Sequence, residues 1–277
     1  MQKKLYFENL DGLKFLCFLS VFFFHSFHTE FIILKNSPIY SFIKKDIFGN
    51  GNIGVNFFFV ISGFLITFLL IEEKKLNGQI SINKFWLRRI LRIWPLFYFC
   101  VFFGFIIFPF LKHLLGQTPN ETANYINYLT FTNNFDLIKL GLPDCSVLGV
   151  LWSIAIEEQF YFVWPLIIYF FSIKKLWIPF ILIILVSILF RALNDSPIIL
   201  EHHTLSCMGD MTVGALGAWL INMLPKFKTF VESFSKKTIS FIYIIFVLIF
   251  FFRDELLLPI YGIRIFERIL IASIILF

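Results

Sequence analysis

The sequence predicts an all-α protein whose helices form a polytopic transmembrane bundle. Of its 277 residues, 58% are hydrophobic and only 15% are charged. A soluble domain of this size carries about a quarter charged residues. Several apolar runs reach or approach the roughly 20 residues that a helix needs to cross a bilayer. Because no linker, repeat or low-complexity stretch divides the chain, we expect residues 1–277 to form a single transmembrane domain.

The apolar runs predict about eight membrane spans. Lys3 and Lys4 precede the first run as in a signal sequence, but no small-residue cleavage site follows, so we expect an uncleaved first helix. The chain stops within an apolar run that no polar tail follows, so we expect that C-terminal spans are missing. The predicted spans cover residues 14–33, 53–71, 93–111, 147–172, 176–193, 205–224, 238–252 and 263–277.

Basic residues orient these spans. Half of the 24 Lys and Arg residues gather in residues 72–92, in the turn at 174–175 and in the loop 226–237. These segments face the cytoplasm if the N-terminus is cytoplasmic, as the preference of basic loops for that side requires. The first outer loop, with Lys35, Lys44 and Lys45, is more basic than this preference predicts. The net charge of +6 therefore reflects membrane topology, and we expect no nucleic-acid partner.

Ionisable groups within a span are costly and usually mark a pathway or an active site. The first set is Asp11, Lys14, His25 and His28. Lys14 and His25 share nearly one stripe of a helix, and His25 lies about 16 Å deeper, near the middle of the hydrocarbon core. Imidazole is the side chain best suited to move a proton near neutral pH. A His that is only hydrogen-bonded to a neighbouring carbonyl is an equal alternative for His25, and the favoured one for His28.

A second set is the pair of carboxylates Glu157 and Glu158, within an apolar span. They lie about 100° apart around a helix, so they face different directions. We expect their depth to match that of His25, where a carboxylate could orient the imidazole, raise its basicity or pair with a buried Arg. An ion pair that only fixes helix packing is the alternative.

The third set is Arg88, Arg89 and Arg92, which crowd one face at the cytoplasmic end of a helix. The planar guanidinium fork suits phosphate oxygens, of a lipid headgroup or of a phosphorylated cosubstrate. Lipid anchoring is the commoner role. The glycines of the span at 53–71 permit close approach of helices. No cluster of His and carboxylate ligands is visible in the sequence, so no metal is implied.

Taken together, these stretches resemble the acyltransferase-3 family of integral membrane acyltransferases, in the order and spacing of that family. The resemblance covers about the first 170 residues well and is weaker near Met208–Trp219. The matching segments are Leu10–Lys14 with His25 beyond it, Val55–Ile66, Phe85–Pro95 and Leu151–Tyr161.

The resemblance implies transfer of an acyl group, usually acetyl from acetyl-coenzyme A, to a hydroxyl of an extracytoplasmic glycan. It also implies the bacterial cytoplasmic (inner) membrane. The family's basic residue and His map onto Lys14 and His25, and its arginine pair maps onto Arg89 and Arg92. Its acidic pair maps onto Glu157 and Glu158. Two features depart from the family: Lys14 stands where Arg is more usual, which loses bidentate geometry, and eight spans are counted where about ten are typical.

The resulting hypothesis is a membrane O-acyltransferase that uses acetyl-CoA or another acyl-CoA as cosubstrate. His25 acts as general base toward the acceptor hydroxyl or carries the acyl group, and Glu157 or Glu158 orients it. Arg88, Arg89 and Arg92, together with Lys14, form the cofactor-binding set. The rivals are a transporter of a lipid-linked sugar or proton-coupled solute, and a non-catalytic truncated family member. The acceptor glycan, the acyl chain, direct transfer against an acyl-enzyme, and the oligomeric state stay open.

Overall fold

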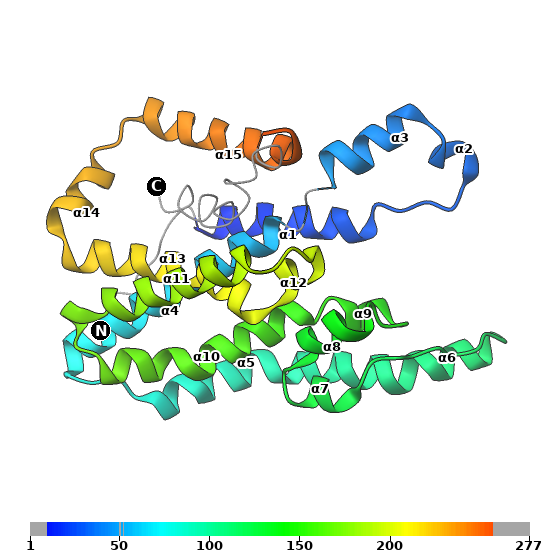
Figure 1. The fold of residues 1–277 in the computed structure, drawn as a ribbon, viewed down its shortest axis with the longest axis horizontal. Coiled ribbons are helices and arrows are strands. Elements are labelled where there is room, and N and C mark those ends of the chain that lie inside the picture. Colours follow the sequence, from blue (N-terminus) through cyan, green and yellow to red (C-terminus); the bar gives the residue numbers. More distant parts are fainter. Residues whose placement is uncertain (1–9, 50, 52, 257–277) are drawn as a thin grey trace. The chain divides into compact units, whose positions relative to one another are not determined.

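The computed structural model describes residues 10–49, 51 and 53–256 (Figure 1). Every regular element among these residues is a helix, which confirms the predicted all-α class. Five helical segments are long and apolar enough to cross a membrane. A further apolar helix, Lys14–Ser26, is shorter. The five segments are Ile53–Asn77, Ile82–Leu114, Ser146–Phe170, Ile173–Ala192 and Thr204–Met223.

The helices follow one another with short connections, and π-helical or 3₁₀ turns interrupt some of them. The α-helices are α1 (Leu10–Ser26), α2 (Ile32–Lys35), α3 (Pro38–Phe42), α4 (Ile53–Asn77), α5 (Ile82–Phe102), α6 (Phe108–Leu114), α7 (Tyr125–Leu129), α8 (Asn133–Leu140), α9 (Ser146–Gly149), α10 (Trp152–Phe170), α11 (Trp177–Ala192), α12 (Pro197–His202), α13 (Thr204–Met223), α14 (Pro225–Glu232) and α15 (Lys236–Leu256). The π-helical turns are Ile43–Ile47 and Phe103–Ile107, and the 3₁₀ turn is Ile173–Lys175.

Most predicted spans coincide with these helices, but the first does not extend as far as predicted. Helix α1 ends at Ser26 rather than at residue 33. The polar residues His28, Thr29 and Glu30 follow shortly after it: His28 contacts Glu30 at 2.5 Å, and the Thr29 hydroxyl accepts from the Phe31 backbone N–H at 3.3 Å. The apolar run is therefore broken by groups that bond outside a helix. The predicted span 263–277 lies outside the described residues.

The third span begins earlier than predicted, at Ile82 rather than at residue 93. The apolar residues between the arginines recur at helical spacing, so the helix on which the arginines were predicted to lie is continuous with the membrane helix. Gly104 in the π-helical turn is buried, and a Cβ atom there would lie 2.4 Å from the Leu148 Cγ atom. This close approach packs the helix onto α9 and closes an apolar core that includes Phe97, Phe131 and Leu148.

The described chain divides into two compact units, and each is described by itself. The first unit comprises the described residues up to 66 and from 210 onward, and the second comprises residues 67–209. In the first unit, a Cβ atom on Gly63 would lie 1.9 Å from the Met211 carbonyl oxygen, and one on Gly214 would lie 2.0 Å from the Val60 carbonyl oxygen. Helices α4 and α13 thus meet backbone to backbone, which confirms the close approach predicted from glycines of the second span.

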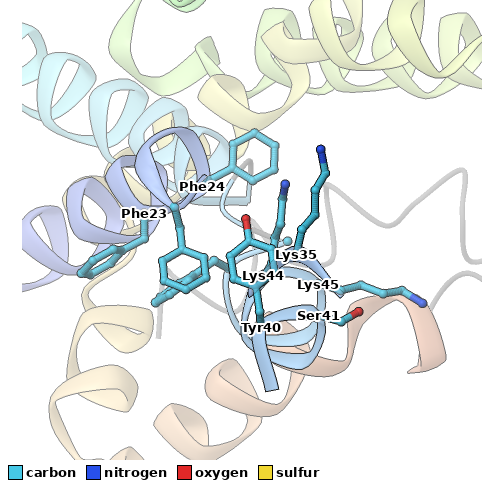
Figure 2. A pocket seen from close by; sticks show the side chains of 10 residues that line it. Phe23, Phe24, Lys35, Tyr40, Ser41, Lys44 and Lys45 are labelled. Atoms are coloured by element: carbon cyan, nitrogen blue, oxygen red, sulfur yellow. The ribbon is translucent and has the colours of Figure 1, made fainter. Parts of the chain in front are cut away.

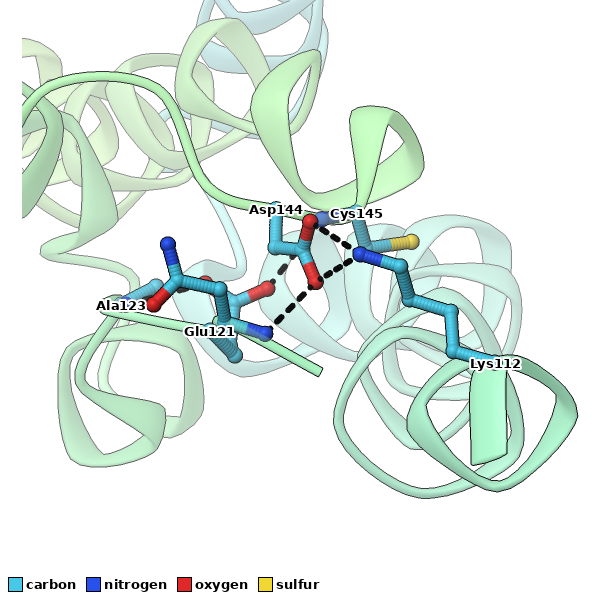
Figure 3. Close-up of polar contacts among 6 residues, drawn as sticks. Lys112, Glu121, Ala123, Asp144 and Cys145 are labelled. Atoms are coloured by element: carbon cyan, nitrogen blue, oxygen red, sulfur yellow. Dashed lines mark hydrogen bonds and ion pairs between the residues drawn. The ribbon is translucent and has the colours of Figure 1, made fainter. Parts of the chain in front are cut away.

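In the second unit, a polar network joins the end of α6 to residues 115–124 and 141–145, which flank α7 and α8 and are here called the loop (Figure 3). The Lys112 ammonium donates to both Asp144 carboxylate oxygens at 2.7 Å, and the Asn120 backbone N–H donates to Asp144 Oδ2 at 3.0 Å. Glu121 accepts backbone N–H bonds from Ala123 at 2.9 Å and Cys145 at 3.2 Å. The hydrogen bond from Lys112, and then that from Asn120, hold the pKa of the Asp144 carboxyl below its usual range.

Candidate active site

The two glutamates of α10 have different hydrogen-bond partners, as their angular separation predicts. The Trp94 indole N–H on α5 donates to Glu158 Oε2 at 2.8 Å. The Tyr161 hydroxyl, one turn further along α10, donates to Glu157 Oε2 at 3.0 Å. Helices α5 and α10 pack side by side here (Figure 1). The carboxylates are therefore held in fixed orientations by aromatic donors.

Arg89 is the arginine of α5 that is half-buried beside this pair of carboxylates and interacts electrostatically with them. Its guanidinium carbon lies 5.5 Å from the centroid of the Tyr161 ring and 5.6 Å from that of Phe85. Cation–π contacts of this length hold a guanidinium over an aromatic face. Its positive charge acts on both Glu157 and Glu158. The site thus combines one half-buried cation with two carboxylates from a neighbouring helix.

Two polar atoms of this site are buried without a hydrogen-bond partner among the described residues. They are Arg89 Nε and Glu158 Oε1. Buried polar groups are nearly always hydrogen-bonded to protein, water or ligand. One donor and one acceptor of opposite charge can therefore take water or a ligand group as a partner.

Arg88 and Arg92 have a different environment from Arg89. Both are exposed, and Arg88 Nη2 lies 3.7 Å from Glu73 Oε2 on α4. The predicted cluster is therefore one half-buried and two exposed arginines on α5. A hollow of about 520 Å³ lies beside the start of this helix, and its lining includes Glu73, Ser81, Lys84 and Tyr169.

Histidine 25 lies in the last turn of α1, next to the final residue Ser26. Its side chain is exposed, and its ring contacts that of Phe24 edge-on with centroids 5.1 Å apart. The position at a helix end differs from the predicted position near the middle of a longer helical span, because α1 stops at the polar residues that follow. Lys14 is half-buried on the same helix. His25 and the glutamates belong to different compact units, so their proximity stays a prediction.

Sequence reasoning did not single out Gln159 as a site residue, although it is next to Glu158. Its side-chain amide donates to the Phe131 carbonyl oxygen at 2.7 Å and to Asn134 Oδ1 at 2.9 Å, and it accepts from the Thr204 hydroxyl. Phe131 has a φ of 54°, in the left-handed region that costs a bulky residue energy. The Gln159 amide thus fixes a strained turn against α10. The sequence signal that could have identified this residue is an uncharged polar side chain within an apolar span.

Two charged residues that support the helices were also missed. Lys74 on α4 donates to the carbonyl oxygens of Ile168, Tyr169 and Phe171 at the end of α10, at 2.5, 2.9 and 2.7 Å. Arg191 is buried on α11, and its guanidinium donates to the Ser206 hydroxyl at 2.9 Å. Its presence in an otherwise apolar span was a usable signal. Among the described residues, no group of three or more His, Cys, Asp or Glu side chains is placed to hold a metal ion.

A family model described as an acyltransferase domain matches residues 7–277. The chain belongs to this acyltransferase family. Its five helical segments that are long and apolar enough to cross a bilayer, together with this family match, identify it as an integral membrane protein.

The chain is also similar to three named O-acetyltransferases. It is 33% identical over 166 residues to the peptidoglycan O-acetyltransferase OatA of Listeria monocytogenes, covering 58% of this chain and 24% of that protein. It is 33% identical over 171 residues to the O-acetyltransferase OatA of Staphylococcus aureus NCTC 8325, covering 60% and 25%. It is 31% identical over 167 residues to the putative peptidoglycan O-acetyltransferase YrhL of Bacillus subtilis, covering 58% and 23%. The chain thus spans about a quarter of the length of these relatives. No solved structure matches it.

Proposed function

We propose that this protein is a membrane O-acyltransferase that moves an acyl group, in particular acetyl, from acyl-CoA to a hydroxyl of cell-wall carbohydrate. The observation that carries the proposal is the family match over residues 7–277, together with relatives named O-acetyltransferases. In this proposal the protein lies in the bacterial cytoplasmic membrane with its N-terminus in the cytoplasm. The donor then arrives from the cytoplasm and the acceptor from the outer side.

The donor side is assigned to α5. Coenzyme A is anionic, and guanidinium groups bind phosphate oxygens well. Exposed guanidinium groups can do so without the desolvation penalty of burying an ion pair in the protein interior. Arg88 and Arg92 are exposed on α5, and Arg89 keeps a buried donor atom for a further partner. Lys14 is assigned to the same donor set as a point charge on α1. The residues present therefore suit an anionic cosubstrate.

On the acceptor side, His25 takes the proton from the attacking hydroxyl. The hydroxyl oxygen forms a bond to the thioester carbonyl carbon, the carbon–sulfur bond breaks, and the proton passes to the leaving thiolate. If His25 instead carries the acyl group, its imidazole nitrogen first bonds to the thioester carbonyl carbon, the carbon–sulfur bond breaks, and the thiolate takes up the imidazole proton. The acceptor hydroxyl oxygen then bonds to the acyl carbon, the carbon–nitrogen bond breaks, and the hydroxyl proton returns to the imidazole. Glu157 or Glu158 orients the imidazole and stabilises its charged form. A positioned base of this kind contributes about 10²–10⁴ in rate.

The test is acylation of cell-wall glycan in a host that lacks its own O-acetyltransferase. We expect the native chain to add acetyl esters that mass spectrometry of released glycan fragments detects. His25→Ala should lower this signal by about 10²-fold or more. His28→Ala is the matched control and should have a much smaller effect, because His28 contacts Glu30 beyond the end of α1.

Membrane levels of each variant are measured in parallel. Normal acylation by the His25→Ala protein would remove His25 from the mechanism. Equal loss from both substitutions together with reduced protein level would assign a structural role to this stretch. A native protein that reaches the membrane, adds no acyl group and instead moves a solute would favour a transporter.

A further inference from the structure

A hollow of about 400 Å³ lies in the first compact unit, between the end of α1 and the segment that follows it (Figure 2). Figure 2 shows Phe23 and Phe24 of α1 on one side and the side chains of Lys35, Lys44 and Lys45 on the other, with Tyr40 between them. The volume is in the range of small-molecule sites, roughly 300–1,000 Å³. The full lining is Phe23, Phe24, Phe27, Lys35, Tyr40, Ser41, Lys44, Lys45, Phe48 and Gly49.

The aromatic side of this hollow is tightly packed. The Phe27 and Tyr40 rings stack with centroids 5.4 Å apart, and the Phe23 and Phe48 rings stack at 4.6 Å. Phe27 also contacts Phe48 at 5.0 Å, so the four rings form one connected group. Stacked rings have few rotamers left to lose, so they offer a preformed flat apolar surface to a ligand.

The other side of the hollow is cationic. Lys44 and Lys45 are exposed, and Lys44 Nζ lies 5.7 Å from the centroid of the Tyr40 ring. The Lys35 Nζ atom lies 3.8 Å from Glu30 Oε2, so this carboxylate balances part of the positive charge of Lys35. The Tyr40 hydroxyl is buried without a hydrogen-bond partner among the described residues. A donor of this kind needs an acceptor, and an anion between the lysines would supply one.

We propose that this hollow binds a saccharide that carries an anionic group, either a carboxylate or a phosphate. The C–H face of the sugar ring packs on the aromatic group, and the anion accepts hydrogen bonds from Lys44, Lys45 and the Tyr40 hydroxyl. The Phe24 ring, which lines the hollow, contacts the His25 ring with centroids 5.1 Å apart. Resting on the proposed function, we therefore assign a sugar held here as the acceptor glycan. The proposal also gives a reason why the first outer loop is more basic than topology requires.

The test measures binding alone, so that it does not depend on acyl transfer. The full chain is placed in nanodiscs of neutral phosphatidylcholine, and glucuronic acid, glucose 6-phosphate and glucose are titrated by saturation-transfer NMR. We expect the two anionic sugars to bind about tenfold more tightly than glucose, because a charge-assisted hydrogen bond has that effect on affinity. Raising the salt concentration should reduce the difference.

Lys44→Glu should weaken binding of the anionic sugars by about tenfold or more and leave glucose unaffected. Lys139→Glu, at an exposed lysine of α8, is the matched control and should change nothing. Tyr40→Phe keeps the ring and removes the hydroxyl, so it should weaken anionic sugars by a smaller factor. Retained thermal stability of each variant confirms that the fold persists.

Equal binding of glucose and the anionic sugars, or equal effects of Lys44→Glu and Lys139→Glu, would overturn the proposal. Displacement of the sugars by phosphatidylglycerol in the nanodisc would make the hollow a lipid-headgroup site and overturn the saccharide assignment. Binding of anionic sugars by a protein that transfers no acyl group would support the hollow as a saccharide site and refute only the proposed function.

Discussion

The Trp94–Glu158 hydrogen bond gives a test of how the candidate site is held together. Replacing Trp94 with Phe removes the donor and leaves Glu158 with neither oxygen hydrogen-bonded, because Oε1 already lacks a partner among the described residues. Hydrogen bonds to charged groups contribute about 1.5–3 kcal/mol to stability, against about 0.5–1.5 kcal/mol for neutral pairs. We therefore expect Trp94→Phe to lower the free energy of unfolding by about 2 kcal/mol.

Trp86 offers a matched control on the same helix pair. Its indole N–H donates to the Tyr161 backbone carbonyl at 3.2 Å, which is a neutral acceptor. Trp86→Phe should therefore cost about 1 kcal/mol. The free energy of unfolding is measured in detergent micelles by circular dichroism, as the proportion of denaturing detergent is raised.

A double-mutant cycle of Trp94→Phe with Glu158→Met, which has no oxygen to accept the indole N–H, isolates the interaction from the loss of indole packing. The expected coupling energy is about 1.5–3 kcal/mol. A coupling energy below about 0.5 kcal/mol would be within the range of independent sites. That result, or an equal cost for the two tryptophan substitutions, would refute the view that the indole holds the carboxylate.

Three further predictions follow from the described contacts. Gly63→Ala should lower stability by about 1–3 kcal/mol, because its Cβ would clash with the α13 backbone, whereas Gly12→Ala meets nothing within 4 Å and should have no such effect; thermal unfolding compares them. The lowered pKa of Asp144 means that its ion pair with Lys112 stabilises the loop fully above the usual carboxyl range and is lost as pH falls through the lower folded value. We measure hydrogen exchange of the loop amides and correct it for the intrinsic exchange rates. As the pH is lowered, the protection of these amides should decrease in the native chain and should change much less in Asp144→Asn. Arg92→Ala should raise the KM for acyl-CoA and reduce its salt dependence; an unchanged KM and salt dependence would remove this arginine from the donor site.

The helical fold was predictable because apolar length is a direct consequence of bilayer thickness. Helices α4, α11 and α13 lie close to the predicted limits for this reason. The ends of α1 and the start of α5 were not predictable from apolar runs alone. After Ser26 the polar residues His28, Thr29 and Glu30 bond to one another or to nearby backbone and the helix ends, whereas at Ile82 an amphipathic basic stretch continues one. Local hydrogen bonds and packing decide such boundaries, and hydropathy does not record them.

The candidate site was predictable in composition and less so in environment. The two glutamates face different partners, as helical geometry requires, but the identity of those partners depends on the register of α5 against α10. Arg89 and Arg92 look alike in the sequence, yet one is half-buried over two rings and the other is exposed. Gln159 was overlooked because an amide gives no charge signal, although its contacts reach three segments. The roles of His25, Lys14 and the arginines stay predictions.

Lys74 has a consequence for how the site can move. A slide of α10 along its own axis would break three hydrogen bonds from one ammonium group at once, and the Trp164 indole bond to the Thr67 hydroxyl at 2.7 Å with them. Both ties run from α10 to α4, so α10 is fixed in register against it and piston motion is disfavoured. Any rearrangement on donor binding should therefore leave α10, and the glutamates that it carries, in the same register against α4.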